Sequence, residues 1–250
     1  MKKMMAANWK MHKTRAEARE SAATLIASLA SMPADREVVI FAPFTVLSDC
    51  SGEFAGKSNF SLGGQNVYSE DHGAFTGEIS PAMLRDAGCT HVLTGHSERR
   101  ALFHESSEFI GKKTAFALTE GLKVTLCIGE TLEQRESGQL EAVLRDQLTK
   151  GLALVDDAVS DQDLSVAYEP VWAIGTGKVA GPAEILETHA IVRKLLVERF
   201  PKQGTSIRIL YGGSVKPDNT AEIIKLDNVD GVLVGGASLD AASMRQIVLA

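Results

Sequence analysis

Cysteine is scarce in this sequence, and its positions exclude the usual cysteine-based architectures. The three cysteines, Cys50, Cys89 and Cys127, are isolated from one another in a chain of 250 residues. An odd number of widely spaced cysteines fits neither a disulfide framework nor a cysteine-based metal site. We therefore expect reduced thiols, a cytoplasmic location and no bound metal.

Positive charge and long apolar runs are also lacking. The 26 lysines and arginines are outnumbered by 32 aspartates and glutamates, so the formal net charge is −6. No basic patch is present, which argues against a nucleic-acid partner. No segment approaches the roughly 20 apolar residues that a membrane helix needs, and residues 1–10 do not resemble a signal peptide. We expect no nucleic-acid or membrane partner, and a bound anion would have to be held by backbone dipoles and a few placed cations.

The sequence does have a regular alternation of short apolar segments with helical patterns. Strands are expected at 4–7, 38–41, 60–63, 91–94, 124–128, 164–168, 207–211 and 229–234. Helices are expected at 15–31, 45–54, 81–87, 108–120, 132–155 and 182–200, then after Pro217 and at 240–249. Such alternation indicates parallel β-α-β units, and eight units in about 250 residues is the usual size of a closed barrel.

We therefore predict an α/β fold in which residues 1–250 form a single-domain (β/α)₈ barrel with a closed, parallel, eight-stranded sheet. The structural alternative is an open doubly wound sheet. That fold would need a Gly-rich dinucleotide loop after an early strand, where this chain has Asn8-Trp9-Lys10 instead.

Chemically capable side chains gather at the carboxyl ends of the predicted strands, where barrels place their active sites. They are Asn8 and Lys10, His96 and Glu98, Glu169, the glycines and serine at 212–214, and the glycines at 235–236. Each has a plainer interpretation: a surface lysine, a structural histidine, a solvated helix start or a simple turn. The opposite strand ends carry no such set, and this asymmetry favours a catalytic site.

Glu169 lies at the end of one predicted strand, directly before Pro170 and an apolar, glycine-ended segment. Proline removes a backbone donor and favours an extended residue before it, so the strand should end there. An apolar segment over a carboxylate could exclude water from a general base. The alternative, a solvated glutamate beside a hydrophobic turn, is equally compatible with this stretch alone.

Glycines after the last two strands suggest a phosphate site. Small residues allow backbone N–H groups to converge, and the loops after these strands commonly hold phosphate in barrels. Gly175, in the segment after Glu169, could add a further N–H group. A carboxylate, an imidazole and an ammonium around a phosphate ester, without a metal cluster, predict proton transfer next to a carbonyl.

Five motifs, in this order, resemble the triosephosphate isomerase family over essentially the whole chain. They are N-W-K at 8–10, G-H-S-E-R-R at 95–100, Y-E-P-V-W-A-I-G-T-G-K at 168–178, Y-G-G-S-V at 211–215 and G-V-L-V-G-G-A-S-L at 231–239. The resemblance implies a TIM barrel, a glycolytic and gluconeogenic isomerase, and a small phosphorylated triose as substrate. It implies no cofactor.

The resemblance also implies roles for individual residues. Glu169 would move a proton between neighbouring carbons of dihydroxyacetone phosphate and D-glyceraldehyde 3-phosphate through an enediolate. A neutral His96, its pKa lowered by the helix that follows it, would donate hydrogen bonds to the substrate oxygens. Lys10 would supply positive charge, Asn8 would orient it, and Glu98 would lie behind the site. The phosphate would be held by Gly175, Ser214, Gly235 and Gly236, with Asn8 and Lys10 also touching substrate.

Two larger features follow from the same resemblance. The family has a lid, here residues 170–178, with the members Pro170, Val171, Trp172, Ala173, Ile174, Gly175, Thr176, Gly177 and Lys178. The family is a homodimer in which the loop at 65–80 reaches the partner, and Thr76 would make that contact.

Two other functions are alternatives for such a barrel. A phosphate-binding barrel aldolase or lyase would want a Schiff-base lysine inside a strand or a metal cluster, and neither is evident. A catalytically silent barrel used for binding would be expected to lack Glu169, Lys10 or His96, and all three are present.

Overall fold

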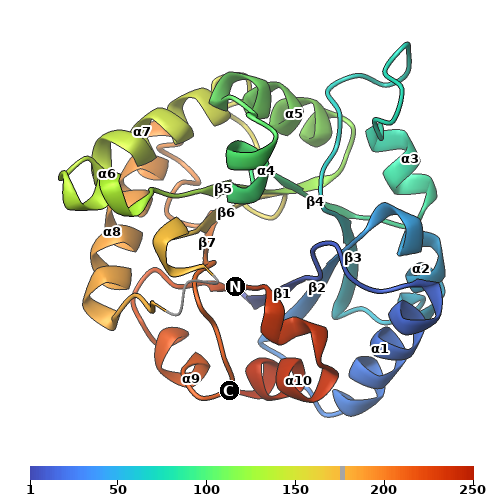
Figure 1. Cartoon of the computed structure of the whole chain (residues 1–250). Coiled ribbons are helices and arrows are strands. Elements are labelled where there is room, and N and C mark those ends of the chain that lie inside the picture. The colour runs from blue at the N-terminus through green and yellow to red at the C-terminus, as the bar shows by residue number, and fades with distance from the viewer. Residues whose placement is uncertain (175–177) are drawn as a thin grey trace.

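The strands form one closed parallel barrel in which each strand pairs with the next and β8 pairs with β1 (Figure 1). The structure is a computed structural model that describes residues 1–174 and 178–250. Its strands are β1 (Lys3–Asn8), β2 (Arg36–Ala42), β3 (Phe60–Gly64), β4 (His91–Thr94), β5 (Lys123–Ile128), β6 (Leu164–Tyr168), β7 (Arg208–Tyr211) and β8 (Gly231–Val234). The predicted (β/α)₈ architecture is confirmed.

Helices surround the barrel (Figure 1). They are α1 (Arg15–Ser28), α2 (Leu47–Phe54), α3 (Pro81–Asp86), α4 (Ser97–Leu102), α5 (Ser107–Thr119), α6 (Leu132–Glu136), α7 (Leu140–Gly151), α8 (Pro182–Arg199), α9 (Thr220–Ile223) and α10 (Ala241–Leu249), with short 3₁₀ turns η1 (Phe44–Val46), η2 (Val171–Ala173) and η3 (Gly236–Leu239). The segment expected to be helical to 155 is two helices, because Gly138 has a φ of +73° between them. The first helix ends three residues earlier than expected.

Alternate strand residues build two separate cores, as expected where helices cover the outside of a barrel. The inner cluster comprises Met4, Ala6, Val39, Phe41, Leu93, Cys127, Ala167, Leu210 and Leu233. A larger cluster packs the intervening residues against the helices. The Phe41 ring occupies the space beside Gly63, where an added Cβ would lie 2.4 Å from it. Cys127 belongs to the inner cluster, so its side chain is part of the packing.

The parallel sheet brings the carboxyl ends of all eight strands to one rim, and the predicted functional side chains follow those ends. No helix in the described ranges 1–174 and 178–250 is long and apolar enough to cross a membrane.

Candidate active site

A cavity of about 470 Å³ opens at the carboxyl-terminal rim of the barrel. It brings together residues from strands at opposite ends of the sequence. Its lining includes Asn8, Lys10, His96, Glu98, Glu169, Ile174, Ser214, Gly235 and Gly236. The predicted catalytic residues and most of the predicted phosphate-binding residues therefore share one cavity.

Lys10 is held in an uncommon backbone conformation just beyond β1. Its φ is +50°, a region that few non-glycine residues adopt. The Lys10 N–H donates to Asn8 Oδ1 at 2.9 Å, and Gln65 Nε2 donates to the Lys10 carbonyl at 2.9 Å and to that of Phe41 at 3.1 Å. These bonds fix the turn, and the Lys10 ammonium pairs with Glu98 Oε1 at 2.5 Å. Glu98 is therefore an ion-pair partner of Lys10.

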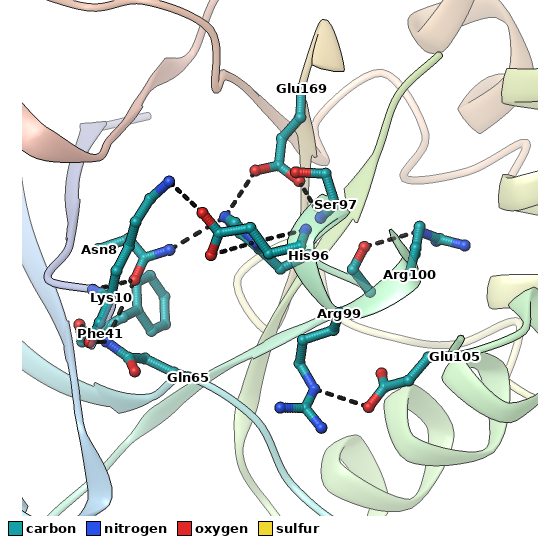
Figure 2. A network of polar contacts seen from close by, with 12 residues as sticks. Asn8, Lys10, Phe41, Gln65, His96, Ser97, Arg99, Arg100, Glu105 and Glu169 are labelled. Atoms are coloured by element: carbon teal, nitrogen blue, oxygen red, sulfur yellow. Dashed lines mark hydrogen bonds and ion pairs between the residues drawn. The ribbon is translucent and has the colours of Figure 1, made fainter. Parts of the chain in front are cut away.

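His96 stands at the junction between β4 and the short helix α4. Gly95, with φ +71°, makes the turn, and His96 then caps the helix. The Glu98 backbone N–H donates to His96 Nδ1 at 3.3 Å, which favours a ring whose proton is on Nε2. That Nε2 lies 2.9 Å from Glu169 Oε1 and 3.2 Å from Asn8 Nδ2 (Figure 2).

Glu169 is 2% exposed, so the solvated-glutamate alternative does not hold. Its Oε2 accepts a hydrogen bond from the Ser97 N–H at 2.9 Å, and its own N–H donates to the Ile128 carbonyl at 2.7 Å. Gly129 permits this close approach, because an added Cβ there would lie 1.7 Å from the Glu169 carbonyl oxygen. The carboxylate is thus positioned by both β5 and the start of α4.

The two buried groups shift each other's protonation equilibria in opposite directions. Burial raises the pKa of Glu169, but His96 and the Ser97 N–H outweigh it, so the Glu169 pKa lies below its ordinary value. Burial lowers the pKa of His96, but Glu169 and then Glu98 outweigh it, so the His96 pKa is raised. The sequence-based prediction of a lowered His96 pKa is therefore wrong for this arrangement, because the contacts with Glu169 and Glu98 outweigh burial and the Lys10 charge.

The turns after β7 and β8 form another part of the cavity wall, beside Glu169 and Lys10. Gly212, Gly213 and Ser214 follow β7, and Gly235 and Gly236 follow β8. Among the described residues, no protein acceptor is recorded for the N–H groups of Ser214, Gly235 or Gly236. An added Cβ on Gly213 would lie 2.2 Å from the Tyr211 hydroxyl. This wall can present backbone donors to an anion.

The described part of the lid segment is tied to a carboxylate that sequence reasoning did not select. Glu130, fully buried, accepts hydrogen bonds from Trp172 Nε1 at 2.8 Å and Tyr168 Oη at 3.0 Å, and Arg135 Nη1 lies 3.2 Å away. Ile174 lines the cavity. Three members of the predicted lid, Gly175, Thr176 and Gly177, lie outside the described residues.

Two further cavity or support residues were missed. Lys216, an exposed lysine two residues beyond Ser214, lines the cavity, and its place directly after Y-G-G-S-V could have drawn attention to it. Gln65, at the start of the long loop after β3, donates hydrogen bonds to Asn8 and Lys10, and its position in the sequence gives no sign of this role.

Thr76, the predicted dimer contact, is exposed and does not line this cavity. Within the described ranges, no cluster of His, Cys, Asp or Glu is arranged to hold a metal ion.

Comparison with known proteins points to one family. The model of the family described as triosephosphate isomerase matches residues 3–250. Proteins named triosephosphate isomerase from Oleidesulfovibrio alaskensis and Nitratidesulfovibrio vulgaris (strain Miyazaki F) are 60% and 61% identical to this chain, with all of both chains covered. A crystal structure of triosephosphate isomerase from Bartonella henselae superimposes with a TM-score of 0.88 at 38% identity, covering 99% of this chain and 98% of that one. This chain therefore belongs to the triosephosphate isomerase family.

Proposed function

We propose that Glu169 is the base, and His96 the hydrogen-bond donor, in the isomerase reaction of this chain. As a triosephosphate isomerase, the chain interconverts dihydroxyacetone phosphate and D-glyceraldehyde 3-phosphate, a step of glycolysis and gluconeogenesis. The observation that carries the assignment is the convergence of a buried carboxylate, an imidazole and an ammonium on one cavity. Glu169 takes a proton from the carbon beside the carbonyl and returns it to the neighbouring carbon through an enediolate.

The contact between Glu169 and His96 must open for this chemistry. The reacting carbons have to lie against Glu169 while the substrate oxygens lie against His96 Nε2, so the substrate comes between the two side chains. Separation removes the carboxylate that raises the His96 pKa. The bond from the Glu98 N–H to Nδ1 remains and favours the neutral ring, which then donates from Nε2 to the developing enediolate oxygen.

Lys10 and Asn8 complete the catalytic group. The Lys10 ammonium supplies fixed positive charge for the enediolate and the phosphate. Its pairing with Glu98 holds the flexible side chain toward the cavity, which gives Glu98 a supporting rather than a proton-transferring role. Asn8 orients Lys10 through the turn bond and faces the His96 ring.

The phosphate binds against the turns after β7 and β8. The N–H groups of Ser214, Gly235 and Gly236 are the proposed donors, and Gly175 would add another from the lid. The lid comprises residues 170–178, and the bond from Trp172 to Glu130 anchors its first part. Because the chain is a triosephosphate isomerase, the aldolase or lyase and the silent barrel are not supported.

The chain is further proposed to be a single-domain cytoplasmic protein that works as a homodimer. The three free, buried cysteines suit a reducing compartment. The segment between β3 and α3 extends away from the barrel (Figure 1), and it carries exposed Thr76 and exposed Phe75. Exposed Met83 in α3 adds apolar surface that a partner subunit would cover.

Lys10→Met tests the assignment. In a coupled assay with D-glyceraldehyde 3-phosphate, the variant should lose most of its turnover while its circular dichroism spectrum stays that of the parent. Lys57→Met removes a charge from an exposed loop lysine and serves as the matched control. A Lys10→Met enzyme as active as Lys57→Met would show that the ammonium has no part in catalysis.

A further inference from the structure

Arg100, in the helix that begins beside His96, spans the ends of two neighbouring strands. Its Nε donates to the Gly95 carbonyl at 2.8 Å and its Nη2 to the Cys127 carbonyl at 3.1 Å, while Nη1 donates to Ser107 Oγ at 3.1 Å. A planar guanidinium holds several donors in fixed relative directions, which lysine cannot do. Arg100 thus contacts the rims of β4 and β5 and the start of α5 at once.

The two carbonyls lie where the ordinary strand pairing stops. The last paired residues of β4 and β5 are Thr94 and Leu126. Gly95 and Cys127 come next, and the left-handed turn at Gly95 takes the chain out of the ladder. Beyond the last paired residues, the hydrogen bonds from the Arg100 guanidinium therefore connect β4 and β5 in place of strand pairing.

Each of the two carbonyls belongs to a residue that is next in sequence either to His96 or to a residue hydrogen-bonded to Glu169. Gly95 directly precedes His96. Cys127 directly precedes Ile128, whose carbonyl accepts the backbone N–H of Glu169 at 2.7 Å. A continuous path thus runs from His96 through Arg100 to β5 and on to Glu169.

The residues around the Arg100 guanidinium leave space for it and do not pair with it through a carboxylate within the described residues. A Cβ on Gly95 would lie 2.9 Å from Arg100 Nη2 and 3.0 Å from the Cys127 carbonyl oxygen. In the described part of the chain, no carboxylate lies within ion-pair distance of Arg100, whereas its neighbour Arg99 pairs with Glu105 at 2.7 Å. Figure 2 shows the two arginines of the motif pointing to different surroundings, with Arg100 on the other side of His96 from Lys10.

We propose that Arg100 is a positioning residue for catalysis, which sets the separation of His96 and Glu169 by bridging the carbonyls of Gly95 and Cys127. The inference rests on the roles proposed above for His96 and Glu169. Arg100 does not line the cavity that contains the proposed phosphate-binding turns after β7 and β8. Loss of the bridge should therefore reduce kcat far more than it changes substrate binding.

Arg100→Ala combined with added guanidinium ion tests the bridge. A displacement of about 1 Å between catalytic groups can reduce the rate by about 10²-fold, so a fall of that order in kcat is expected. A second cavity, of about 220 Å³, is lined by Arg100, Gly95 and Glu169, so a free guanidinium ion can reach the vacated position. Millimolar guanidinium chloride should restore kcat saturably by about tenfold, since a free ion regains the contacts but not the tethering.

The controls separate the bridge from general effects. Urea, a neutral analogue of similar shape, and sodium chloride at equal concentration should not restore activity. Arg145→Ala, which removes an exposed arginine on α7, should be neither impaired nor activated by guanidinium. The inhibition constant of inorganic phosphate should be unchanged in Arg100→Ala. Parental kcat, a loss confined to KM, or equal rescue by urea would overturn the proposal.

Arg100→Lys covers the case in which Arg100→Ala does not fold. Lysine keeps the charge and reach but cannot donate to both carbonyls in fixed directions, so kcat should still fall while phosphate inhibition is retained. A folded Arg100→Lys enzyme with parental kcat contradicts the bridge. Glu169→Gln is assayed in parallel: if it is inactive while both Arg100 variants are fully active, the proposed function stands and only the Arg100 inference fails.

Discussion

Glu169 Oε1 lies 2.9 Å from His96 Nε2, so the two groups proposed to act on one substrate face each other directly. The carboxylate comes from the end of β6 and the imidazole from the end of β4. Their spacing depends on backbone bonds, from Glu169 to the Ile128 carbonyl and from the Ser97 N–H to Glu169. Small displacements of either element should therefore alter the chemical step.

Shortening the base by one methylene group tests this dependence. Glu169→Asp keeps the charge but withdraws the carboxylate by about 1 Å, which can reduce the rate by about 10²-fold. We expect a large loss in kcat and a small change in KM, measured in the coupled assay in both directions. Glu169→Gln, which keeps the length but removes the base, is the reference for complete loss. A loss confined to KM would argue that Glu169 contributes to binding instead.

Buried histidines should make the fold sensitive to acid. His189 is fully buried between Tyr168 and Tyr211, with Nδ1 2.8 Å from the Asn228 carbonyl. Burial lowers its pKa from 6.5 to about 4. Between these values the unfolded chain binds a proton that the folded chain does not, so stability falls as the pH falls from about 6.5 to about 4.

A single group with this shift contributes on the order of 3 kcal/mol to that pH dependence. His91, whose pKa is lowered to about 3 by burial, acts in the same direction. His189→Gln should therefore flatten the pH dependence of the free energy of unfolding between pH 4 and 6.5, measured by urea denaturation. Replacing exposed His72 by Gln should leave the slope unchanged. Equal slopes for the parent and His189→Gln would refute the argument.

The barrel could be predicted from the sequence because each strand and each strand end is marked by neighbouring residues in the chain. Each strand is a short apolar segment, and each functional side chain follows a strand end that parallel topology must bring to one rim. The break between the helices at Leu132–Glu136 and Leu140–Gly151 is also local, because Gly138 between them adopts a positive φ of +73° that ends the first helix.

The contacts that position the catalytic side chains could not be predicted in the same way. The raised pKa of His96 depends on its contact with Glu169, which is 73 positions away in the sequence, and Gln65 reaches Lys10 across 55 positions. Neither partner is specified by spacing or hydrophobic pattern. The family motif marks Arg100 as part of G-H-S-E-R-R, but only the folded chain shows which carbonyls it contacts.

Lys216 should assist the arrival of substrate. It is an exposed cation lining the cavity of a protein with a net charge of −6, so it can attract a phosphate dianion. Lys216→Glu should lower kcat/KM by roughly tenfold at low ionic strength, and the difference should shrink near 1 M salt, where the screening length is about 3 Å. Lys57→Glu makes the same charge change away from the cavity. If it lowers kcat/KM equally, Lys216 has no local effect.

Thr76 should lie in the subunit interface of the proposed homodimer. The loop that carries it is internally packed, since the rings of Tyr68 and Phe75 are 4.6 Å apart, yet Thr76 itself is exposed. Placing a charge there would bury an unpaired guanidinium on assembly, which is costly. Thr76→Arg should therefore raise the dimer dissociation constant by at least about tenfold.

Sedimentation velocity over a dilution series measures this change, with activity assayed at the same concentrations. Thr119→Arg makes the matched substitution at an exposed position on α5 and should sediment like the parent. Shortening the loop within 70–78 should give monomers with impaired activity, because Gln65, at the start of the same loop, supports Asn8 and Lys10. A Thr76→Arg protein and a shortened protein that both remain dimeric on dilution would show that this loop does not form the interface.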